Sequence, residues 1–381
     1  MQGFLRKPVL IILFVCILKV PGFGETIAPF VMPSARSGAL GGTHAALADD
    51  FYSLFTNPAA FVGVKEQFSA AEVTVSMYGP VFEAMDLAFD IAGSDLDSID
   101  ISGLVGPKGF AAGFDMGGPV SVGWIGRGLG FGLFNRTKTE VVLSGTSMRP
   151  LISEEILLVG GYSFRLLNNQ SHVLDLGFLG KGFFRGAMDM AVSVFELEAI
   201  IRDPMDHLFK TQLGVGLDLG LRYTFASAFS VALVCYDVYS PALVSSYASL
   251  GAFFDKEDPV DARGYATVAR RLDLGLMYRI RSPLLSRYIS DFTIMVDYQN
   301  FLDFFALIPR NPVLNIGIGA EVVVLQALSL RVGIADALPA IGFGLDLSFM
   351  KIEFAIRGKE LGLDPGMNPV YAVDLGLLFR Y

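Results

Sequence analysis

The sequence contains few of the residues from which catalytic and metal sites are built. Its 381 residues include three histidines, two cysteines and one tryptophan. His44, His172 and His207 are far apart in the chain and have no neighbouring ligands at metal-site spacing. Two cysteines cannot form a disulfide framework or a thiol cluster, and the sequence has no Gly-x-Ser-x-Gly nucleophile elbow. We therefore expect no metal site, no cofactor and no enzymatic activity.

Long hydrophobic runs are also absent after residue 20, although the chain as a whole is hydrophobic. Apolar residues make up 52% of it, charged residues 18%, and the mean hydropathy is +0.52. A membrane-spanning helix requires about 20 consecutive apolar residues. A hydrophobic chain without such runs can still enter a bilayer as a closed β-barrel, whose strands alternate lipid-facing and lumen-facing side chains. The alternative is a soluble lipocalin-like barrel, a fold that is typically much shorter.

Basic residues are outnumbered by acidic ones, 29 to 38, and the net charge is −9. This balance argues against nucleic acid as a partner and against polybasic attachment to anionic lipid. Near the N-terminus, Arg6 and Lys7 precede an apolar stretch at residues 9–18 and small residues at 22–24. That order is typical of a secretory signal peptide, so we predict export and cleavage near Gly24.

Three segments, at residues 217–225, 272–280 and 373–381, alternate strictly between two kinds of residue. One face of each carries leucines followed by an aromatic residue, which matches a lipid-facing band that ends at an aromatic girdle. The other face would line a polar lumen in which charges pair between neighbouring strands. Its charged residues are Asp218, Arg222, Asp273, Arg279, Asp374 and Arg380. The alternative is a soluble sandwich with a polar outer face.

The last strand stops at the C-terminus, with Phe379 and Tyr381 on the predicted lipid face. Chains that the bacterial outer-membrane assembly machinery inserts resemble this one in ending with an alternating strand and a terminal aromatic residue. Five closely spaced strands are expected in the C-terminal part, at residues 313–325, 328–336, 339–349, 351–358 and 370–381. With the strands that precede them, the sequence predicts an all-β fold, a transmembrane antiparallel β-barrel of about 14 strands.

Three stretches interrupt the strand pattern. Residues 117–132 are rich in glycine and predict either a tight hairpin or a kinked strand with a β-bulge. Residues 186–210 have apolar residues at roughly helical spacing and predict an amphipathic helix or a long loop. Residues 240–264, first aromatic and then acidic, predict an external loop that either folds over its own aromatic residues or meets an apolar ligand.

Residues 34–64 are the part of the chain that least resembles the remainder. Small residues come first, then two acids, then aromatic residues and an Asn-Pro break, where the residue before proline is kept out of the α region. The residues that define the stretch are Gly38, Gly41, Gly42, Asp49, Asp50, Phe51, Tyr52, Phe55, Asn57 and Pro58. From composition alone, they form a loop and a short helix packed on whatever follows.

The order of the glycine-rich run, the Ala-Asp-Asp triplet, the aromatic pair and Asn57-Pro58-Ala59 resembles the N-terminal hatch of the FadL-type outer-membrane transporters, including their spirochaetal FadL-like and PorV-like branches. The resemblance covers residues 34–64 closely and the rest by pattern. After a signal peptide at 1–24, it implies a hatch, or plug, at 25–64 and a barrel at 65–381 in the outer membrane of a diderm bacterium. It also implies uptake of hydrophobic small molecules, above all long-chain fatty acids, with lipid and the barrel-assembly machinery as further partners.

In this interpretation the ligand displaces the hatch and then diffuses inward. The three glycines would act as the hinge, and the three aromatic residues would line the ligand path. The two acids and Asn57 would hold the hatch to lumenal arginines, and a kinked strand within 117–132 would open a lateral exit to the lipid. Two other classes stay open: a PorV-like partner of a protein-secretion or attachment system, and a surface adhesin or structural barrel.

Overall fold

The computed structural model describes residues 25–80, 110–144, 147–193, 207–280 and 289–379. The predicted signal peptide, Arg380 and Tyr381 lie outside these ranges. Within them, one sheet contains nineteen strands. They are β1 (Glu25–Ile27), β2 (Gln67–Ala70), β3 (Val73–Tyr78), β4 (Phe110–Gly126), β5 (Leu129–Ser144), β6 (Ser147–Asn168), β7 (His172–Asp189), β8 (Val192–Ser193), β9 (Phe209–Phe225), β10 (Phe229–Tyr239), β11 (Pro241–Tyr247), β12 (Asp261–Val268), β13 (Arg271–Ile280), β14 (Ile289–Tyr298), β15 (Ile316–Val324), β16 (Leu328–Ala335), β17 (Leu338–Asp346), β18 (Met350–Glu360) and β19 (Pro369–Phe379).

The described helices are short. They are α2 (Ala35–Ala39), α3 (Ser53–Thr56) and α6 (Leu250–Phe254), with the 3₁₀ turns η1 (Pro58–Ala60), η5 (Phe301–Phe305) and η6 (Pro312–Asn315). No helix in the described ranges is long and apolar enough to cross a membrane.

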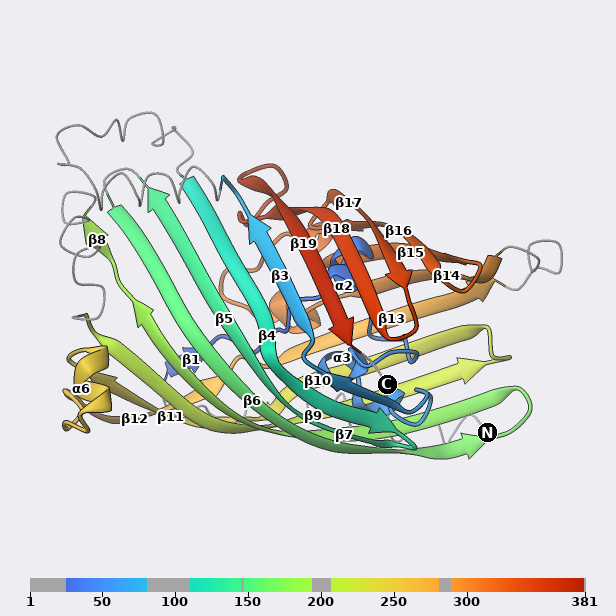
Figure 1. The fold of residues 1–381 in the computed structure, drawn as a ribbon, viewed down its shortest axis with the longest axis horizontal. Helices are drawn as coiled ribbons and strands as arrows, with labels where there is room; N and C mark the ends of the chain where they lie inside the picture. Colours follow the sequence, from blue (N-terminus) through green and yellow to red (C-terminus); the bar gives the residue numbers. More distant parts are fainter. Residues whose placement is uncertain (1–24, 81–109, 145–146, 194–206, 281–288, 380–381) are drawn as a thin grey trace.

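The sheet closes into a barrel, and its wall among the described residues consists of fourteen antiparallel strands (Figure 1). Four wall strands are each divided by a kink, into β2 and β3, β7 and β8, β10 and β11, and β12 and β13. β19 pairs with β3, with Asp374 opposite Ser76, and this pairing closes the wall. β1 is not part of the wall, since it runs parallel to the edge of β12. The predicted fold class and strand number are confirmed.

The wall has an apolar outer face and a polar inner face. In β19, Leu375 is 46% exposed on the outside whereas its neighbour Asp374 is 1% exposed on the inside. Asp218 and Asp273 are buried in the same way, with exposed fractions of 4% and 5%. Exposed leucine, isoleucine, valine and phenylalanine side chains recur on the outer face from β4 to β19. An apolar belt of this extent is typical of a barrel wall in contact with lipid.

The wall is taller on one side than on the other. β4, β5, β6, β7 and β9 contain 16 to 22 residues, whereas β14 to β19 contain 8 to 11 (Figure 1). Tight turns at residues 127–128, 226–228 and 325–327 join the strands at one end. Such turns face the periplasm in outer-membrane barrels, so we refer to the opposite end as the outer rim.

Two predicted interruptions are corrected by the structure. Residues 240–264 are not one loop, because β11 and the start of β12 belong to the wall and only residues 248–260 connect them. Pro241 misled the prediction, yet it is the first residue of β11, a position that proline tolerates in a strand. Of residues 186–210, the first four end β7 and residues 192–193 form β8, while 194–206 lie outside the described residues.

The third interruption contains both predicted features. Arg127 and Gly128 form the tight turn between β4 and β5, and both have positive φ. The β4–β5 register shifts between Gly117 and Ser121, which is the predicted irregularity. The break between β2 and β3 lies opposite this shift, because β3 pairs with β4 up to Gly117 and β2 pairs with it again from Val122. The two strands are therefore kinked at the same level.

Candidate functional site

The N-terminal segment, residues 25–64, lies inside the barrel (Figure 1). Its helix α2 contacts β16 to β19, and η1 contacts β6, β7 and β9. Because these strands belong to opposite parts of a closed wall, the segment crosses the lumen. Its turns begin at capping side chains, since Ser34 accepts a hydrogen bond from the Ser37 N–H and Asn57 accepts one from the Ala59 N–H.

Glycines on the inner face of the wall form the seat of this segment. A Cβ atom added at Gly130 would lie 2.6 Å from Cδ2 of Leu54, and one added at Gly275 would lie 2.8 Å from Cβ of Ala45. Such distances require the segment to shift, so glycine serves here for close approach of two backbones. The seat glycines are Gly123, Gly130, Gly177, Gly220, Gly275, Gly317, Gly319, Gly333 and Gly342.

The glycines predicted as a hinge lie in the tightest part of the seat. Gly41 and Gly42 have φ values of +70° and +77°, which favour glycine, and Gly41 packs directly on backbone carbonyls of β15 and β16. Gly38 lies in α2, where an added Cβ would be 2.5 Å from the Asp374 carboxylate. These three residues therefore pack the segment tightly against the wall.

Asn57 joins two turns of the N-terminal segment. Its side chain is fully buried; Nδ2 donates to the Ala45 carbonyl at 2.6 Å, and Oδ1 accepts from the Ala59 N–H at 2.9 Å. Gly220 of β9 packs against this amide, and a side chain there would collide with it. Asn57 thus maintains the fold of the segment and its fit to β9. The predicted pairing of Asn57 with a lumenal arginine is wrong.

Arg36 links the segment to the wall through buried ion pairs. Its guanidinium donates to Asp49 at 2.9 Å, to Asp50 at 2.7 Å and to Glu321 of β15 at 3.1 Å. Burial on its own would lower the pKa of Arg36, but the three carboxylates outweigh burial and raise that pKa well above its ordinary value. The guanidinium therefore stays charged and holds three carboxylates together.

The network continues along the wall at the level of Glu321. Arg331 of β16 is fully buried and donates to Glu321 at 2.7 Å and to Glu353 of β18 at 3.2 Å. Lys351 adds a further contact to Glu353 at 2.7 Å. Through Arg36, the segment is thereby connected to a network of buried ion pairs on β15, β16 and β18.

The predicted pairing of Asp49 and Asp50 with Arg222 or Arg279 is not found, because both acids pair with Arg36 of the same segment; Arg380 lies outside the described residues. Arg222 instead donates to the Ala46 carbonyl at 2.9 Å, and Arg279 pairs with Asp291 at 3.2 Å. The predicted lumenal acids do form ion pairs within the wall. These pairs are Asp218 with Lys181, Asp273 with Arg271, and Asp374 with Arg357.

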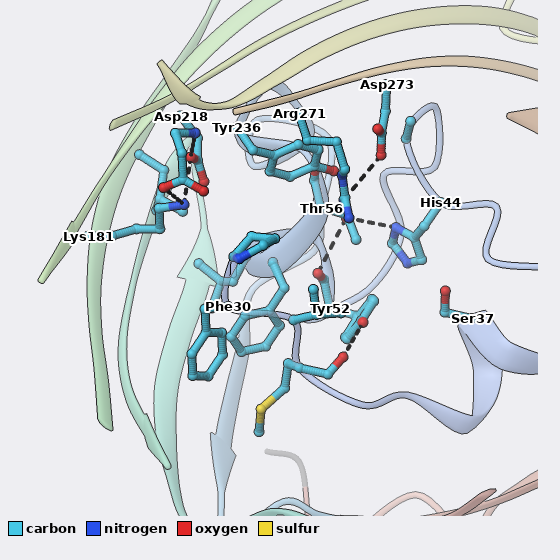
Figure 2. A pocket seen from close by; sticks show the side chains of 18 of the residues that line it. Phe30, Ser37, His44, Tyr52, Thr56, Lys181, Asp218, Tyr236, Arg271 and Asp273 are labelled. Atoms are coloured by element: carbon cyan, nitrogen blue, oxygen red, sulfur yellow. Dashed lines mark hydrogen bonds and ion pairs between the residues drawn. The ribbon is translucent and has the colours of Figure 1, made fainter. Parts of the chain in front are cut away.

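A first cavity, of about 170 Å³, lies between the segment and the tall side of the wall, and we name it the inner cavity. Figure 2 shows two ion pairs, Lys181 with Asp218 and Arg271 with Asp273, along one side and the rings of Phe30 and Tyr52 across from them. Apolar residues make up much of its lining: Phe30, Val31, Met32, Leu54, Phe55, Leu157, Val159 and Leu179. Its lining cations are Lys181 and Arg271, and its lining acids are Asp218, Asp237, Asp273 and Asp297. The inner cavity thus combines an apolar side with an excess of carboxylates.

A second cavity, of about 360 Å³, opens nearer the outer rim, and we name it the outer cavity. Its lining has an excess of positive charge. The charged residues of this lining are Arg136, Lys138, Arg357, Lys359, Asp115 and Asp336. The first three of these basic residues have carboxylate partners, at 2.6 to 2.7 Å. Lys359 has no ion pair within the described part of the chain, and its ammonium lies 4.1 Å from the ring centre of Tyr78.

The two cavities are neighbours, separated in part by the coil at residues 28–34, which we name the strap. Val31 and Met32 of the strap line both cavities, as does Tyr52. The Tyr52 hydroxyl donates to the Met32 carbonyl at 2.5 Å, and Arg185 donates to the Ala28 carbonyl at 3.0 Å. Among the described residues, the strap makes fewer hydrogen bonds and ion pairs with the rest of the protein than Arg36 and its partners do.

The predicted ligand-path residues divide between these environments. Tyr52 and Phe55 line the inner cavity, whereas Phe51 is fully buried in the core with Phe134 and Ile125. Sequence reasoning missed Glu321, Lys359 and the strap. A single charge in an otherwise apolar alternating strand, as at Glu321, was the available signal. No cluster of three or more metal-ligating side chains occurs among the described residues.

No protein-family model and no curated protein matches this sequence. Solved structures with a similar fold include the toluene transporter TbuX of Ralstonia pickettii, with a TM-score of 0.48 and 13% identity, covering 93% of this chain and 98% of that chain. A FadL homologue of Pseudomonas aeruginosa gives a TM-score of 0.47 and 11% identity, covering 94% and 98%. The toluene transporter TodX of Pseudomonas putida gives 0.46 and 12%, covering 93% and 99%. Each is a similarity of fold at low sequence identity.

Proposed function

We propose that this protein is an outer-membrane channel of a diderm bacterium, through which hydrophobic small molecules, in particular long-chain fatty acids, diffuse inward past the N-terminal segment. The observation that carries the proposal is the pair of neighbouring cavities with different chemistry. The outer cavity offers an unpaired ammonium, and the inner cavity offers an apolar surface. The FadL-like branch of the resemblance fits this arrangement.

The charges assign an orientation to a fatty acid. Its carboxylate would meet Lys359 in the outer cavity, where no carboxylate of the described residues competes at ion-pair distance. The inner cavity would repel the carboxylate, because its acids outnumber its cations. Its apolar side would accept the acyl chain, and each buried methylene contributes about 0.8 kcal/mol. Head group and chain thus prefer different cavities.

Passage between the cavities requires the strap to move. We assign the gate to residues 28–34, with the hydrogen bond from Tyr52 to Met32 as its central tie. The ion network of Arg36 and the glycine seat hold the rest of the segment in place, so the path opens without release of the whole plug. No energy source is implied, and the direction of transport follows the concentration gradient. The coincident kinks near Gly117 offer a lateral exit, because Met32 and Pro33 of the strap pack against Gly117.

The test is uptake of a labelled long-chain fatty acid, and of the alcohol of the same length, by cells that lack their own transporter. Lys359→Met should lower fatty-acid uptake and leave alcohol uptake unchanged. Lys65→Met is the control for the loss of a lysine, since Lys65 is exposed and lines neither cavity. Equal loss for acid and alcohol, or no loss for either, would contradict the assignment of Lys359.

A PorV-like secretion partner and an adhesin are the other functions consistent with the sequence. Both are expected to have a lumen without an apolar path. The apolar lining of the inner cavity favours transport. Absence of uptake by a correctly assembled barrel, for the acid and the alcohol alike, would favour one of these alternatives.

A further inference from the structure

An apolar loop packs against the outside of the barrel at the outer rim. It comprises residues 301–309, directly after β14, and we name it the outer apolar loop. Tyr298 ends β14 on the outer face, and the rings of Phe301 and Phe304 lie 5.9 and 5.5 Å from its ring. Leu302 packs with Leu272 in a cluster on the outer face of β9, β10 and β13. The loop therefore lies against the outer wall and not over the lumen.

The loop exposes apolar side chains to an unusual extent. Residues 304–309 read Phe-Phe-Ala-Leu-Ile-Pro and contain no polar side chain. Phe305 is 66% exposed, Ile308 is 70% exposed and Leu307 is completely exposed. Isolated exposed apolar residues are common on soluble proteins, but a continuous group of this kind marks a surface that contacts something apolar.

Polar contacts at the base of the loop hold it in the conformation that exposes these apolar side chains. The Asp303 carboxylate accepts from the Arg310 N–H at 2.9 Å and from the Asn315 amide at 3.3 Å. The Arg310 guanidinium pairs with Asp336 at 2.7 Å and donates to the Glu360 carbonyl. The polar groups thus point to the rim, and the apolar side chains are held away from it.

The loop also starts at the height where a lipid belt ends. β14 has 10 residues, and at about 3.4 Å per residue and a tilt of about 40° it rises roughly 25 Å, which matches the apolar belt of outer-membrane barrels. Below the loop, Ile294 and Val296 of β14 are exposed on the outer face, and Ile316 of β15 continues the same surface. By the same arithmetic, the 17 residues of β9 rise roughly 45 Å, so α6 at the tall side lies well beyond the belt.

We propose that the outer apolar loop inserts into the outer leaflet of the membrane, with Phe305, Leu307 and Ile308 among the acyl chains of its lipids. The lipid-facing belt of β14 and β15 continues directly into the loop, which is why lipid is the occupant that the structure favours. At the outer end of β14 and β15, the loop continues the apolar outer face of the wall. It sets the depth of the barrel in the bilayer at this side.

Tryptophan fluorescence of the full chain in bilayers tests this proposal. Trp124 is the only tryptophan, and it stacks on Phe131, which is 54% exposed on the outer face, so the unmodified protein provides a lipid-facing reference. In a Trp124→Phe background, Leu307→Trp and Phe305→Trp each place the probe in the loop. Phe254→Trp, in α6, is the matched control, because Phe254 is 71% exposed in another loop of the outer rim.

In phosphatidylcholine vesicles with brominated acyl chains, the loop probes should emit at shorter wavelength than the control and be quenched as Trp124 is. The Phe254→Trp probe should be quenched by aqueous iodide instead. Loop probes that iodide quenches and brominated chains do not would overturn the proposal. Quenching by brominated chains that disappears as protein is concentrated in the bilayer would assign the loop to contact with a second copy, and would overturn it as well. Two probe positions are included so that one poorly folding variant does not decide the result.

Discussion

Removal of Arg36 should detach the N-terminal segment while leaving the wall folded. In Arg36→Leu, Asp49, Asp50 and Glu321 lose their shared counter-ion inside the barrel. Removal of one partner from a buried ion pair costs about 3–5 kcal/mol, because negative charge stays buried with its compensation reduced, although Glu321 keeps its ion pair with Arg331. When the segment leaves its seat, those carboxylates regain water, so the cost falls on the docked state alone. The population of the detached state should therefore rise by about two to four orders of magnitude.

Arg127→Leu is the control for this experiment. Arg127 also pairs with a carboxylate, that of Glu66, but the two side chains are 79% and 49% exposed. An exposed pair of this kind is worth about 0–1 kcal/mol, so its loss should leave the segment docked.

Hydrogen exchange of residues 35–64, measured by mass spectrometry on the folded barrel in micelles, reports on docking. Gel electrophoresis of unheated samples shows separately whether the wall is intact, because a folded barrel migrates as a compact band that is lost on heating. The Arg36→Leu variant should lose protection in the segment and keep the compact band, and its uptake of apolar ligands should increase. Protection equal to that of the Arg127→Leu control would refute the role of the ion network. Loss of the compact band together with protection would instead show that wall and segment unfold as one unit.

Two further predictions concern the seat and the belt. Gly220→Ala places a Cβ against Asn57 and should therefore detach the segment from its seat. Gly182→Ala is the control, because a Cβ there meets nothing within 4 Å, and it should change the hydrogen exchange of the segment little. Equal protection of the segment in both variants would show that the seat tolerates a side chain. Val332, 55% exposed on the outer face of β16, should lie in lipid, so Val332→Lys should lower the unfolding free energy in bilayers by about 2–4 kcal/mol in a urea titration. A loss below about 1 kcal/mol would argue that this face is not in lipid.

The sequence was sufficient for the wall wherever strands alternate strictly. The repeats around Asp218, Asp273 and Asp374 follow the alternation expected from the sequence, because one face of each strand is apolar and the other carries a buried acid. Residues 240–264 were misread, since Pro241 and an acidic run are local signals of a loop. The pairing of β11 with β9 on one side and β12 on the other overrides those signals.

The site was less accessible to sequence reasoning. The stretch 34–64 was recognised as special, but the partners of its acids were not, because Arg36 and Glu321 are separated by 285 positions and meet only after the barrel has closed. Lys359 carries no local signal either. It is distinguished by the absence of an ion pair in the described structure, and that depends on strand register across the wall.

The glycine seat has a consequence for the order of events during assembly. The N-terminal segment is synthesised before any wall strand, yet it rests on β4 and β5 as well as on β15 to β17. Its binding surface therefore does not exist until the last strands have been added and β19 has joined β3. Contacts between residues so distant in the chain form late, because loop closure must precede them. We expect each newly made barrel to be transiently leaky, because its N-terminal segment can dock only after the wall that receives it has closed.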